Sequence, residues 1–372
     1  MPDIIKVISK QDYLDFIRFP WKVHGPDSPW VPPLIKEQQK ELNPATGTFY
    51  RHGKAQLFLA LKGKQAVGRI AAIISHRHQE AQEEDTGFFG FFECIDDPEV
   101  ANALLRTAED WLIHAGMSLV RGPASFTIYD PCGITVKGHD LRPGLGMAYT
   151  PAYYAKLLEN AGYRKAKDLY AFHLHREQAN LELKKLQSRR EDVDLSGFKL
   201  RSIKDKELQD EAEIFAHVFT EAWKKNWGAF PMKPEDFLHA SKSLKPFLDK
   251  RLISILENNG RPIGIFLAVP DPWEILQKSN GRINLRSFVS ILRWRKTITH
   301  YRVIFMGVLP EYQLSPAVAL LIEQFYESWI YFPKMKTMEF SWIVENNHSM
   351  IQLLELIKAK PLQTFRVYEK FI

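Results

Sequence analysis

The segment that decides the fold is a strand-turn-strand pattern at residues 56–75, which reads QLFLALKGKQAVGRIAAIIS. Residues 56–61 are mostly apolar, Lys62-Gly63-Lys64 forms the turn, and residues 66–75 are mostly apolar again. Two apolar runs of strand length around a short turn with glycine are typical of a β-hairpin. An antiparallel hairpin in a chain that also carries helical crossovers predicts a mixed sheet of the α/β class.

The segments around this hairpin alternate between patterns typical of strands and patterns typical of helices. We expect strands at 4–8, 87–95, 118–121 and 167–175, and helices at 10–23, 98–115 and 151–160. The helix at 98–115 has its apolar residues at helical spacing, Pro98 stands where a first-turn proline belongs, and Asp96 or Asp97 precedes it as an N-cap. The predicted order is therefore β, α, β, β, β, α, β, α, β.

The second half of the chain repeats this order. Gly68 in the run VGRI matches Gly264 in IGIF, and Leu158 in LLE matches Leu354 in a second LLE, with the same separation of 196 positions in both pairs. A repeat of this length indicates two copies of one domain rather than a solenoid. We predict an N-terminal domain at residues 1–176, a helical linker at 177–196 and a C-terminal domain at 197–372.

The bulk composition restricts the class of protein. The 372 residues have a net charge of +6. This charge is consistent with an anionic partner such as the phosphates of CoA, a nucleic acid or a membrane surface, and equally with an ordinary basic protein. The two cysteines, Cys94 and Cys132, form no metal-binding pattern, so we expect no metal. The chain has no apolar stretch of ~18 residues, and residues 1–10 lack a signal-peptide core. We expect a cytoplasmic protein without stable membrane insertion and without a DNA partner.

Several short runs carry a family resemblance. The runs GVLPEY at 307–312, SWIVENN at 341–347 and RVYEK at 366–370 resemble the pyrophosphate-loop strand, the next strand and the closing strand of the GNAT acyl-CoA N-acyltransferase superfamily. A closer resemblance, to a poorly characterised bacterial group of GNAT-like proteins, rests on FFGFFE at 88–93, EAWKKNWG at 221–228 and PM at 231–232. It covers nearly the whole chain and implies two tandem GNAT-like domains.

The resemblance implies acyl-CoA as the donor, held on backbone N–H groups at a helix N-terminus. The family loop, (Arg/Gln)-x-x-Gly-x-(Gly/Ala), falls on residues 313–318 in the second domain, where Gln313 keeps the first position. Pro316 replaces the first glycine and has no N–H to donate, and Val318 replaces the second small residue. In the first domain the slot falls on residues 96–101, which carry three carboxylates and no glycine. The implied cofactor-binding residues are Val308, Gln313, Ser315, Ala317 and Asn347; Asn347 is alternatively a helix cap.

The catalytic residues depart from the family pattern. Many GNAT enzymes use a tyrosine as general acid on the second-last helix, where this chain has Leu158 and Leu354. Glu93 lies among phenylalanines on the cleft strand, and such a carboxylate can have a raised pKa and act as a base; alternatively, it faces solvent at a strand end. Glu345 is the second candidate base.

Aromatic residues suggest where an acceptor binds. Trp223, Asn226 and Trp227 end the first helix of the second domain, in the region that borders the acceptor pocket of GNAT folds, although core packing is an equal interpretation. Tyr149 lies in a long loop at 122–150 and Tyr154 just beyond it, where a loop of this length can cover a cleft or form a surface flap.

The segment at 286–302 is basic, with Phe288, Ile291, Leu292 and Trp294 interleaved. Such a segment can bind a membrane surface or RNA, but it is more often an amphipathic helix with a solvated basic face.

We predict an acyltransferase that moves an acyl group from acyl-CoA, or a related activated donor, to an amine of a small-molecule acceptor. The alternative is a catalytically inactive GNAT-fold protein that binds a small ligand or partner. Aminoacyl-tRNA as a donor stays a further variant without a specific motif.

Overall fold

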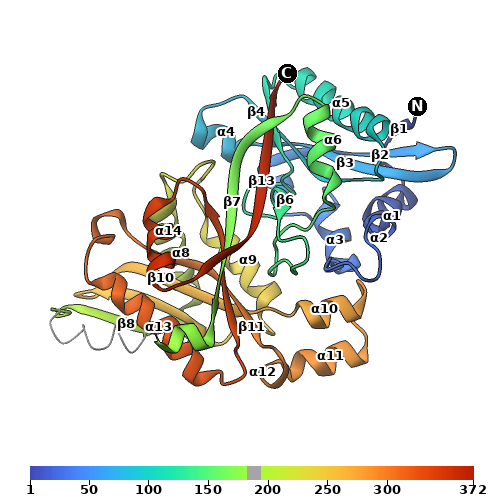
Figure 1. Cartoon of the computed structure of the whole chain (residues 1–372). Coiled ribbons are helices and arrows are strands. Elements are labelled where there is room, and N and C mark those ends of the chain that lie inside the picture. Colours follow the sequence, from blue (N-terminus) through green and yellow to red (C-terminus); the bar gives the residue numbers. More distant parts are fainter. Residues whose placement is uncertain (182–193) are drawn as a thin grey trace. The chain divides into compact units, whose positions relative to one another are not determined.

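The computed structural model describes residues 1–181 and 194–372, and these form two compact units (Figure 1). The first unit contains Met1–Tyr170, Leu276–Asn284 and Leu362–Ile372, and the second contains Ala171–Ile275 and Leu285–Pro361. The predicted linker at 177–196 falls largely on residues 182–193, which lie outside the described residues. The domain boundaries proposed from the repeat stay a prediction.

The first unit holds a mixed sheet in the order β1-β2-β3-β4-β5-β13, with β6 also beside β13. Its strands are β1 (Asp3–Lys6), β2 (Gly53–Lys62), β3 (Gln65–Ser75), β4 (Thr86–Cys94), β5 (Leu119–Gly122), β6 (Ile134–Lys137) and β13 (Lys360–Phe371), and β7 (Arg164–His175) leads into the second unit. Its helices are α1 (Lys10–Arg18), α2 (Pro20–Val23), α3 (Ile35–Leu42), α4 (His76–Gln82), α5 (Pro98–His114) and α6 (Tyr153–Asn160), with a 3₁₀ turn at Phe49–Arg51.

The second unit repeats the same arrangement in the order β12-β11-β10-β9-β8. Its strands are β8 (Phe198–Ser202), β9 (Ile253–Asn258), β10 (Arg261–Pro270), β11 (His300–Val308) and β12 (Thr337–Val344). Its helices are α8 (Leu208–Trp223), α9 (Pro234–Leu244), α11 (Leu285–Leu292), α12 (Trp294–Thr297), α13 (Ala317–Tyr331) and α14 (His348–Leu356), while α10 (Trp273–Ser279) runs across the unit boundary. Short 3₁₀ turns lie at Asp205–Glu207, Lys250–Leu252 and Pro310–Tyr312. The predicted mixed α/β class is confirmed.

The predicted hairpin is present as β2 and β3, which pair antiparallel with Lys62 opposite Gln65. α5 packs on this sheet through an inward stripe of Val100, Leu104, Ala108 and Leu112, all fully buried. Its N-terminus is the expected one, because Pro98 occupies the first turn and the Asp97 side chain accepts a hydrogen bond from the Glu99 N–H. The main core of the first unit therefore lies between the hairpin and α5.

In both units a pair of parallel strands runs together for a few residues and then parts. β4 and β5 pair only from Thr86 opposite Leu119 to Phe88 opposite Arg121. β11 and β12 pair from His300 opposite Thr337 to Val303 opposite Phe340. Beyond Phe88, β4 bonds to the chain after β5, because the carbonyl of Phe89 accepts from the Ala124 N–H over 2.9 Å. Among the described residues, no further strand pairing joins β11 to β12 beyond Val303. The two parallel strands of each unit therefore splay apart.

A register shift accompanies the parting of the strands in each unit. β4 shifts against β3 between Arg69 and Ala71, next to Phe91, whose φ is 50°. β11 shifts against β10 between Leu267 and Ala268. An extra residue in one strand of a pair bends that strand and increases its twist, which turns the end of β4 away from β5. Among the described residues, no helix is long and apolar enough to cross a lipid bilayer.

The close approach of β4 to the chain after β5 gives a test of the splayed geometry. A Cβ on Gly90 would lie 2.0 Å from the carbonyl oxygen of Ala124. We expect Gly90→Ala to lower the free energy of unfolding by about 3 kcal/mol, because backbone on both sides must move. Gly25→Ala is the control, since no atom lies within 4 Å of its Cβ position. Chemical denaturation measures both, and equal stability of the two variants would contradict the close approach.

Candidate functional site

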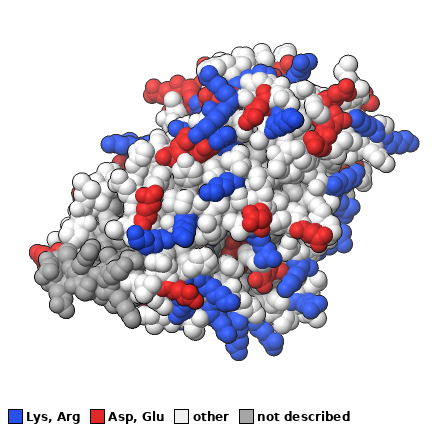
Figure 2. Space-filling view, viewed as in Figure 1, with Lys and Arg blue, Asp and Glu red and all other residues white. Residues whose placement is uncertain are grey.

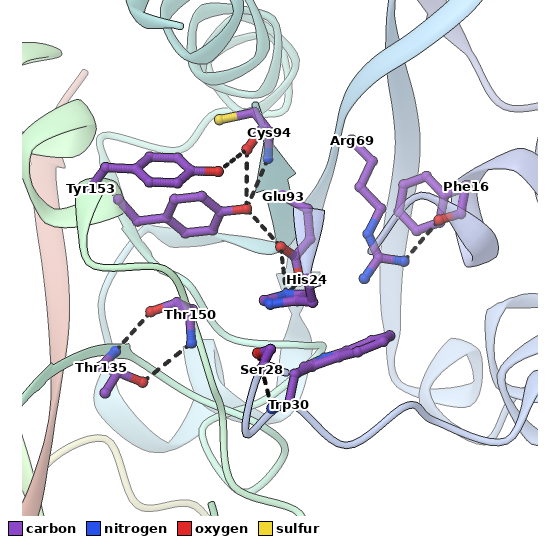
Figure 3. Close-up of polar contacts among 11 residues, drawn as sticks. Phe16, His24, Ser28, Trp30, Arg69, Glu93, Cys94, Thr135, Thr150 and Tyr153 are labelled. Atoms are coloured by element: carbon purple, nitrogen blue, oxygen red, sulfur yellow. Dashed lines mark hydrogen bonds and ion pairs between the residues drawn. The ribbon is translucent and has the colours of Figure 1, made fainter. Parts of the chain in front are cut away.

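The candidate site lies at the end of β4 in the first unit, where the strand has turned away from β5. Glu93 is the next-to-last residue of β4, and it is only 7% exposed although it carries a carboxylate. Figure 3 shows its side chain pointing toward His24, with Arg69 of the neighbouring strand nearby. A buried carboxylate is costly unless hydrogen bonds and opposite charges compensate it, so its partners define the site.

Tyr154, in the first turn of α6, is the nearest partner of Glu93. Its hydroxyl donates to Oε2 of Glu93 over 2.6 Å and accepts from the N–H of Cys94 over 3.0 Å. Burial, and then the adjacent Glu93, raises the pKa of Tyr154 well above its usual range, so the phenol keeps its proton. Tyr153 donates to the carbonyl of Cys94 over 2.8 Å. Two tyrosine hydroxyls therefore satisfy the backbone at the end of β4.

His24 is the second partner of Glu93. Its backbone ends α2, and its Nε2 lies 3.3 Å from Oε2 of Glu93, with almost no exposed side-chain surface. The imidazole stacks on Trp30 at a centroid distance of 4.7 Å and tilts against Tyr149 at 5.7 Å. The other ring nitrogen, Nδ1, has no hydrogen-bond partner among the described residues, so it is the ring nitrogen left to accept a proton.

Arg69 lies opposite Glu93 in the register of β3 and β4. Its guanidinium is buried, donates to the carbonyl of Phe16 over 2.8 Å and lies over the rings of Phe16 and Phe91. Burial lowers the pKa of Arg69 to about 10, and the charge of Glu93 opposes this shift. The side chain is still cationic at neutral pH, so it offsets the buried negative charge of Glu93.

These contacts give an arrangement with defined chemistry. A histidine whose Nε2 faces a fixed carboxylate can accept a proton on Nδ1, and the carboxylate stabilises the imidazolium that forms. The sequence predicted Glu93 as the base and placed Tyr149 and Tyr154 near a cleft, and the structure brings all three together. His24, Arg69 and Trp30 were missed, because a histidine before a Pro-rich loop and an arginine inside an apolar strand carry no spacing signal.

The loop at 122–150 is held by its own polar contacts. Thr135 and Thr150 exchange backbone-to-hydroxyl hydrogen bonds of 2.9 and 3.2 Å (Figure 3). Asp130 accepts from the backbone and hydroxyl of Thr127, yet burial raises its pKa to about 6. Burial raises the pKa of Cys132 to about 12, so its thiol is protonated and unreactive at neutral pH. The described residues contain no group of three or more metal-ligating side chains of the His, Cys, Asp and Glu types.

The N-terminus of α5, where the family pattern would put a pyrophosphate, is occupied by the protein's own carboxylate. Asp97 accepts from the N–H of Glu99 over 2.9 Å and pairs with Lys62 over 2.7 Å. A helix N-terminus favours an anion, and here a side chain supplies it. This agrees with the acidic residues that the sequence shows at this slot.

In the second unit, backbone N–H groups of the matching segment, residues 313–318, form hydrogen bonds within the segment and with the turn before it. The N–H groups of Ser315, Ala317 and Val318 bond to Tyr312 O, Ser315 Oγ and Ser315 O, respectively, at 3.0 to 3.3 Å. Ser315 is half-buried, Ala317 is buried and Gln313 is exposed. Val308 is buried at the end of β11, and Asn347 caps α14 by accepting from Met350 N–H over 3.2 Å. The cap is the alternative that the sequence left open for Asn347, and CoA binding by these five residues stays a prediction.

The proposed acceptor residues of the second unit lie beside the splayed strand β11. Trp223 stacks on Phe219 at 4.7 Å, and a Cβ on Gly307 would meet its ring at 2.6 Å, so this tryptophan covers the strand. Asn226 and Trp227 follow in a half-buried turn, and Glu345 is half-buried just beyond β12. Among the described residues, no side chain bonds to the backbone of β11 from residue 304 to residue 308, in contrast with Cys94 of β4.

The sequence matches no protein-family model. It is 34% identical over 376 positions to protein YghO of Escherichia coli (strain K12), covering 98% of this chain and 94% of the relative. It is 30% identical over 375 positions to the bacterial ceramide synthase of Caulobacter vibrioides (strain NA1000 / CB15N), covering 99% and 97%.

Solved structures share the fold at low identity. A tandem GNAT protein from the clavulanic acid biosynthesis pathway superposes with a TM-score of 0.55 at 11% identity, covering 100% of this chain and 98% of that one. A GCN5-related N-acetyltransferase from Sphaerobacter thermophilus gives 0.53 at 13% identity, covering 99% and 95%. These similarities show the fold alone.

The two tyrosines at the end of β4 give a matched test of the site. We expect Tyr154→Phe to lower the free energy of unfolding by about 2 kcal/mol, because it leaves the Cys94 N–H unpaired and removes a donor from Glu93. Tyr153→Phe should cost less, because Tyr153 is only half-buried and the variant leaves Glu93 with its donor Tyr154. Thermal and urea unfolding compare the two, and the opposite order of stabilities would contradict the hydrogen-bond network.

Proposed function

We propose that the chain, which belongs to the same family as protein YghO and the bacterial ceramide synthase and has the fold of GNAT proteins, is an N-acyltransferase. The reaction moves an acyl group from acyl-CoA to the amine of a small-molecule acceptor. The observation that carries this proposal is the buried Glu93–His24 pair at the end of the splayed strand β4, in which Nε2 of His24 faces the carboxylate and Nδ1 has no hydrogen-bond partner among the described residues.

The chemistry of acyl transfer explains why such a pair is useful. An amine is largely protonated at neutral pH, and it must lose a proton before its lone pair attacks the thioester carbonyl. His24 accepts this proton on Nδ1, Glu93 stabilises the imidazolium, and Tyr154 holds the carboxylate in place. The C–N bond forms as the C–S bond breaks, the new amide nitrogen loses its surplus proton to solvent, and the proton on His24 passes to the departing thiolate, so the pair ends in its starting state.

The acceptor proposed here is a long-chain amine. One relative is named a bacterial ceramide synthase, and its sequence aligns over 99% of this chain. A ceramide is an amide between a fatty acid and a long-chain amino alcohol, so forming its amide bond is an N-acyl transfer. In the first unit the proposed acceptor contacts are Tyr149 and Tyr154, beside His24 and Glu93. Trp223, Asn226 and Trp227 stay a separate proposal for the second unit.

For the second unit taken by itself, the proposed donor contacts are Val308, Gln313, Ser315, Ala317 and Asn347. The edge of β11 supports this choice, because its backbone has no side-chain partner among the described residues and can bond to the amides of a pantetheine arm. Glu345, just beyond β12, stays a second proposed base.

A specific observation favours a different candidate, a GNAT-fold protein that binds a small ligand or partner without acyl transfer. The two segments that align with the family's pyrophosphate loop, residues 96–101 and 313–318, both differ from a loop whose free backbone N–H groups bind phosphate. Asp97 fills the first slot with a carboxylate, and in the second the N–H groups of Ser315, Ala317 and Val318 are engaged locally while Pro316 has none. Donor binding therefore separates the two candidates.

Calorimetric titration with acetyl-CoA and with longer acyl-CoAs tests donor binding directly. We expect saturable binding, and we expect Gln313→Ala to weaken it several-fold while Asp97→Ala, in the other unit, leaves it unchanged. The reason is that Gln313 keeps the first position of the family loop, whereas Asp97 replaces the phosphate. An absence of binding at millimolar acyl-CoA would sink the transferase proposal and leave the binding protein.

The base is tested by kinetics on the same protein. We expect His24→Ala to lower kcat for amide formation by a factor of about 10² to 10³, with acyl-CoA affinity unchanged, because only proton removal is lost. His114→Ala is the control, since this exposed histidine bonds, within the described part of the chain, only to the Asp110 carbonyl on α5. Transfer to a long-chain amine is followed by mass spectrometry of the amide, and a kcat within twofold of the parent protein would exclude His24 as the base.

A further inference from the structure

The helix α11 turns an apolar stripe toward solvent. Leu285, Phe288, Val289 and Leu292 follow the i, i+3, i+4, i+7 spacing that puts side chains on one face of a helix. They are 80%, 51%, 38% and 68% exposed, respectively. In a globular protein such a stripe usually faces the core, and an exposed one marks an interaction site.

The helix is nevertheless anchored to its unit by the opposite face. Ser287 and Ile291 of α11 are buried, and so is Trp294 at the start of α12, which stacks on Phe332 at a centroid distance of 5.9 Å. The exposed stripe is therefore a fixed feature of the surface rather than a consequence of a detached segment. Ile291 and Trp294 of this basic segment are therefore buried in the core, whereas Phe288 and Leu292 are exposed to solvent.

The charged residues of the chain segment that carries the stripe are of one sign. Between Glu274 and Glu311 the chain has seven Lys or Arg residues and no Asp or Glu. Arg286, Arg293 and Lys296 are exposed and form no ion pair among the described residues, whereas Arg295 pairs with Asp249 over 2.7 Å. Figure 2 shows Lys and Arg side chains gathered at the lower edge of the view, over α11 and α12.

We propose that α11 and the start of α12 dock the second unit on an anionic phospholipid surface. The apolar stripe enters the boundary between headgroups and acyl chains, and the flanking arginines and lysine bind the phosphate groups. The helix lies on the surface rather than across it, since its eight residues are too few to span a bilayer. The biological reason rests on the proposed function, because a long-chain amine and its amide product partition into membranes.

The charge pattern argues for lipid over a second copy of the chain. A symmetric dimer through this stripe would bring the same uncompensated cations of two copies toward each other, with no acidic residue of the segment to pair with them. An anionic lipid surface supplies the opposite charge at every position. The dimer is therefore an outcome that the test must be able to detect.

Vesicle co-sedimentation of the full-length protein tests the docking surface. We expect the protein to sediment with vesicles of phosphatidylcholine containing phosphatidylglycerol, and to stay in the supernatant with phosphatidylcholine alone or at high salt. Removing the apolar stripe with Leu285→Asn and Leu292→Asn together should lower the partition coefficient by about tenfold. Reversing the charge with Arg286→Glu and Arg293→Glu together should lower the partition coefficient by about tenfold or more.

Two matched controls distinguish binding through this surface from nonspecific binding of other exposed apolar side chains to vesicles. Ile113→Asn on α5 and Leu356→Asn on α14 each replace an aliphatic side chain that is 48% or 59% exposed elsewhere, and both should sediment like the parent protein. The proposal is overturned if the parent protein ignores anionic vesicles, if it binds neutral vesicles equally, or if the stripe variants bind unchanged. It is also overturned if sizing chromatography shows a dimer that the stripe variants dissociate.

The same variants keep this inference separate from the proposed function. Because Leu285 and Leu292 lie outside the proposed base and donor residues, the double variant should transfer an acyl group to a water-soluble short-chain amine at the parent rate. Vesicle binding without any acyl transfer would contradict the proposed function alone. Acyl transfer without vesicle binding would contradict the docking surface alone.

Discussion

The parting of β4 from β5 is the constraint on which the rest of the first unit depends. A strand that loses its neighbour exposes backbone N–H and C=O groups, and these must find other partners when they are buried. At Cys94 the partners are the hydroxyls of Tyr153 and Tyr154. The bond to Tyr154 also positions Glu93, so one hydroxyl both satisfies the strand edge and fixes a buried carboxylate. In the second unit β11 parts from β12 in the same way, and the described residues leave its edge without side-chain partners.

Much of the fold could be predicted from the sequence, since local patterns encode it. The hairpin of β2 and β3, the N-terminus of α5 and the long repeat all follow from periodicity, turn residues and internal similarity. The site could be predicted only in part. Glu93 stands out as a carboxylate among phenylalanines, but His24 and Arg69 reach it from α2 and β3, and only tertiary contact brings them together. The orientation of α11 could not be predicted either, because spacing defines an apolar stripe without saying whether it faces core or solvent.

The two proposed functional surfaces place different demands on the chain. At the end of β4, Arg69, His24 and Tyr154 offset the cost of burying Glu93, and removing any one of them would leave a charge or a polar group without compensation. On α11 the cost is an apolar stripe in water, which a lipid surface would relieve. A transferase that joins an acyl chain to a long-chain amine needs both a dry polar site for the proton and access to lipid-soluble substrates.

The central claim is that His24 and Glu93 act as one unit in acyl transfer. A double-mutant cycle on kcat, with His24→Ala, Glu93→Gln and the double variant, tests it most directly. If the carboxylate works through the imidazole, the double variant is no slower than His24→Ala alone. Losses that multiply in the double variant would show that the two residues act independently and would contradict the account.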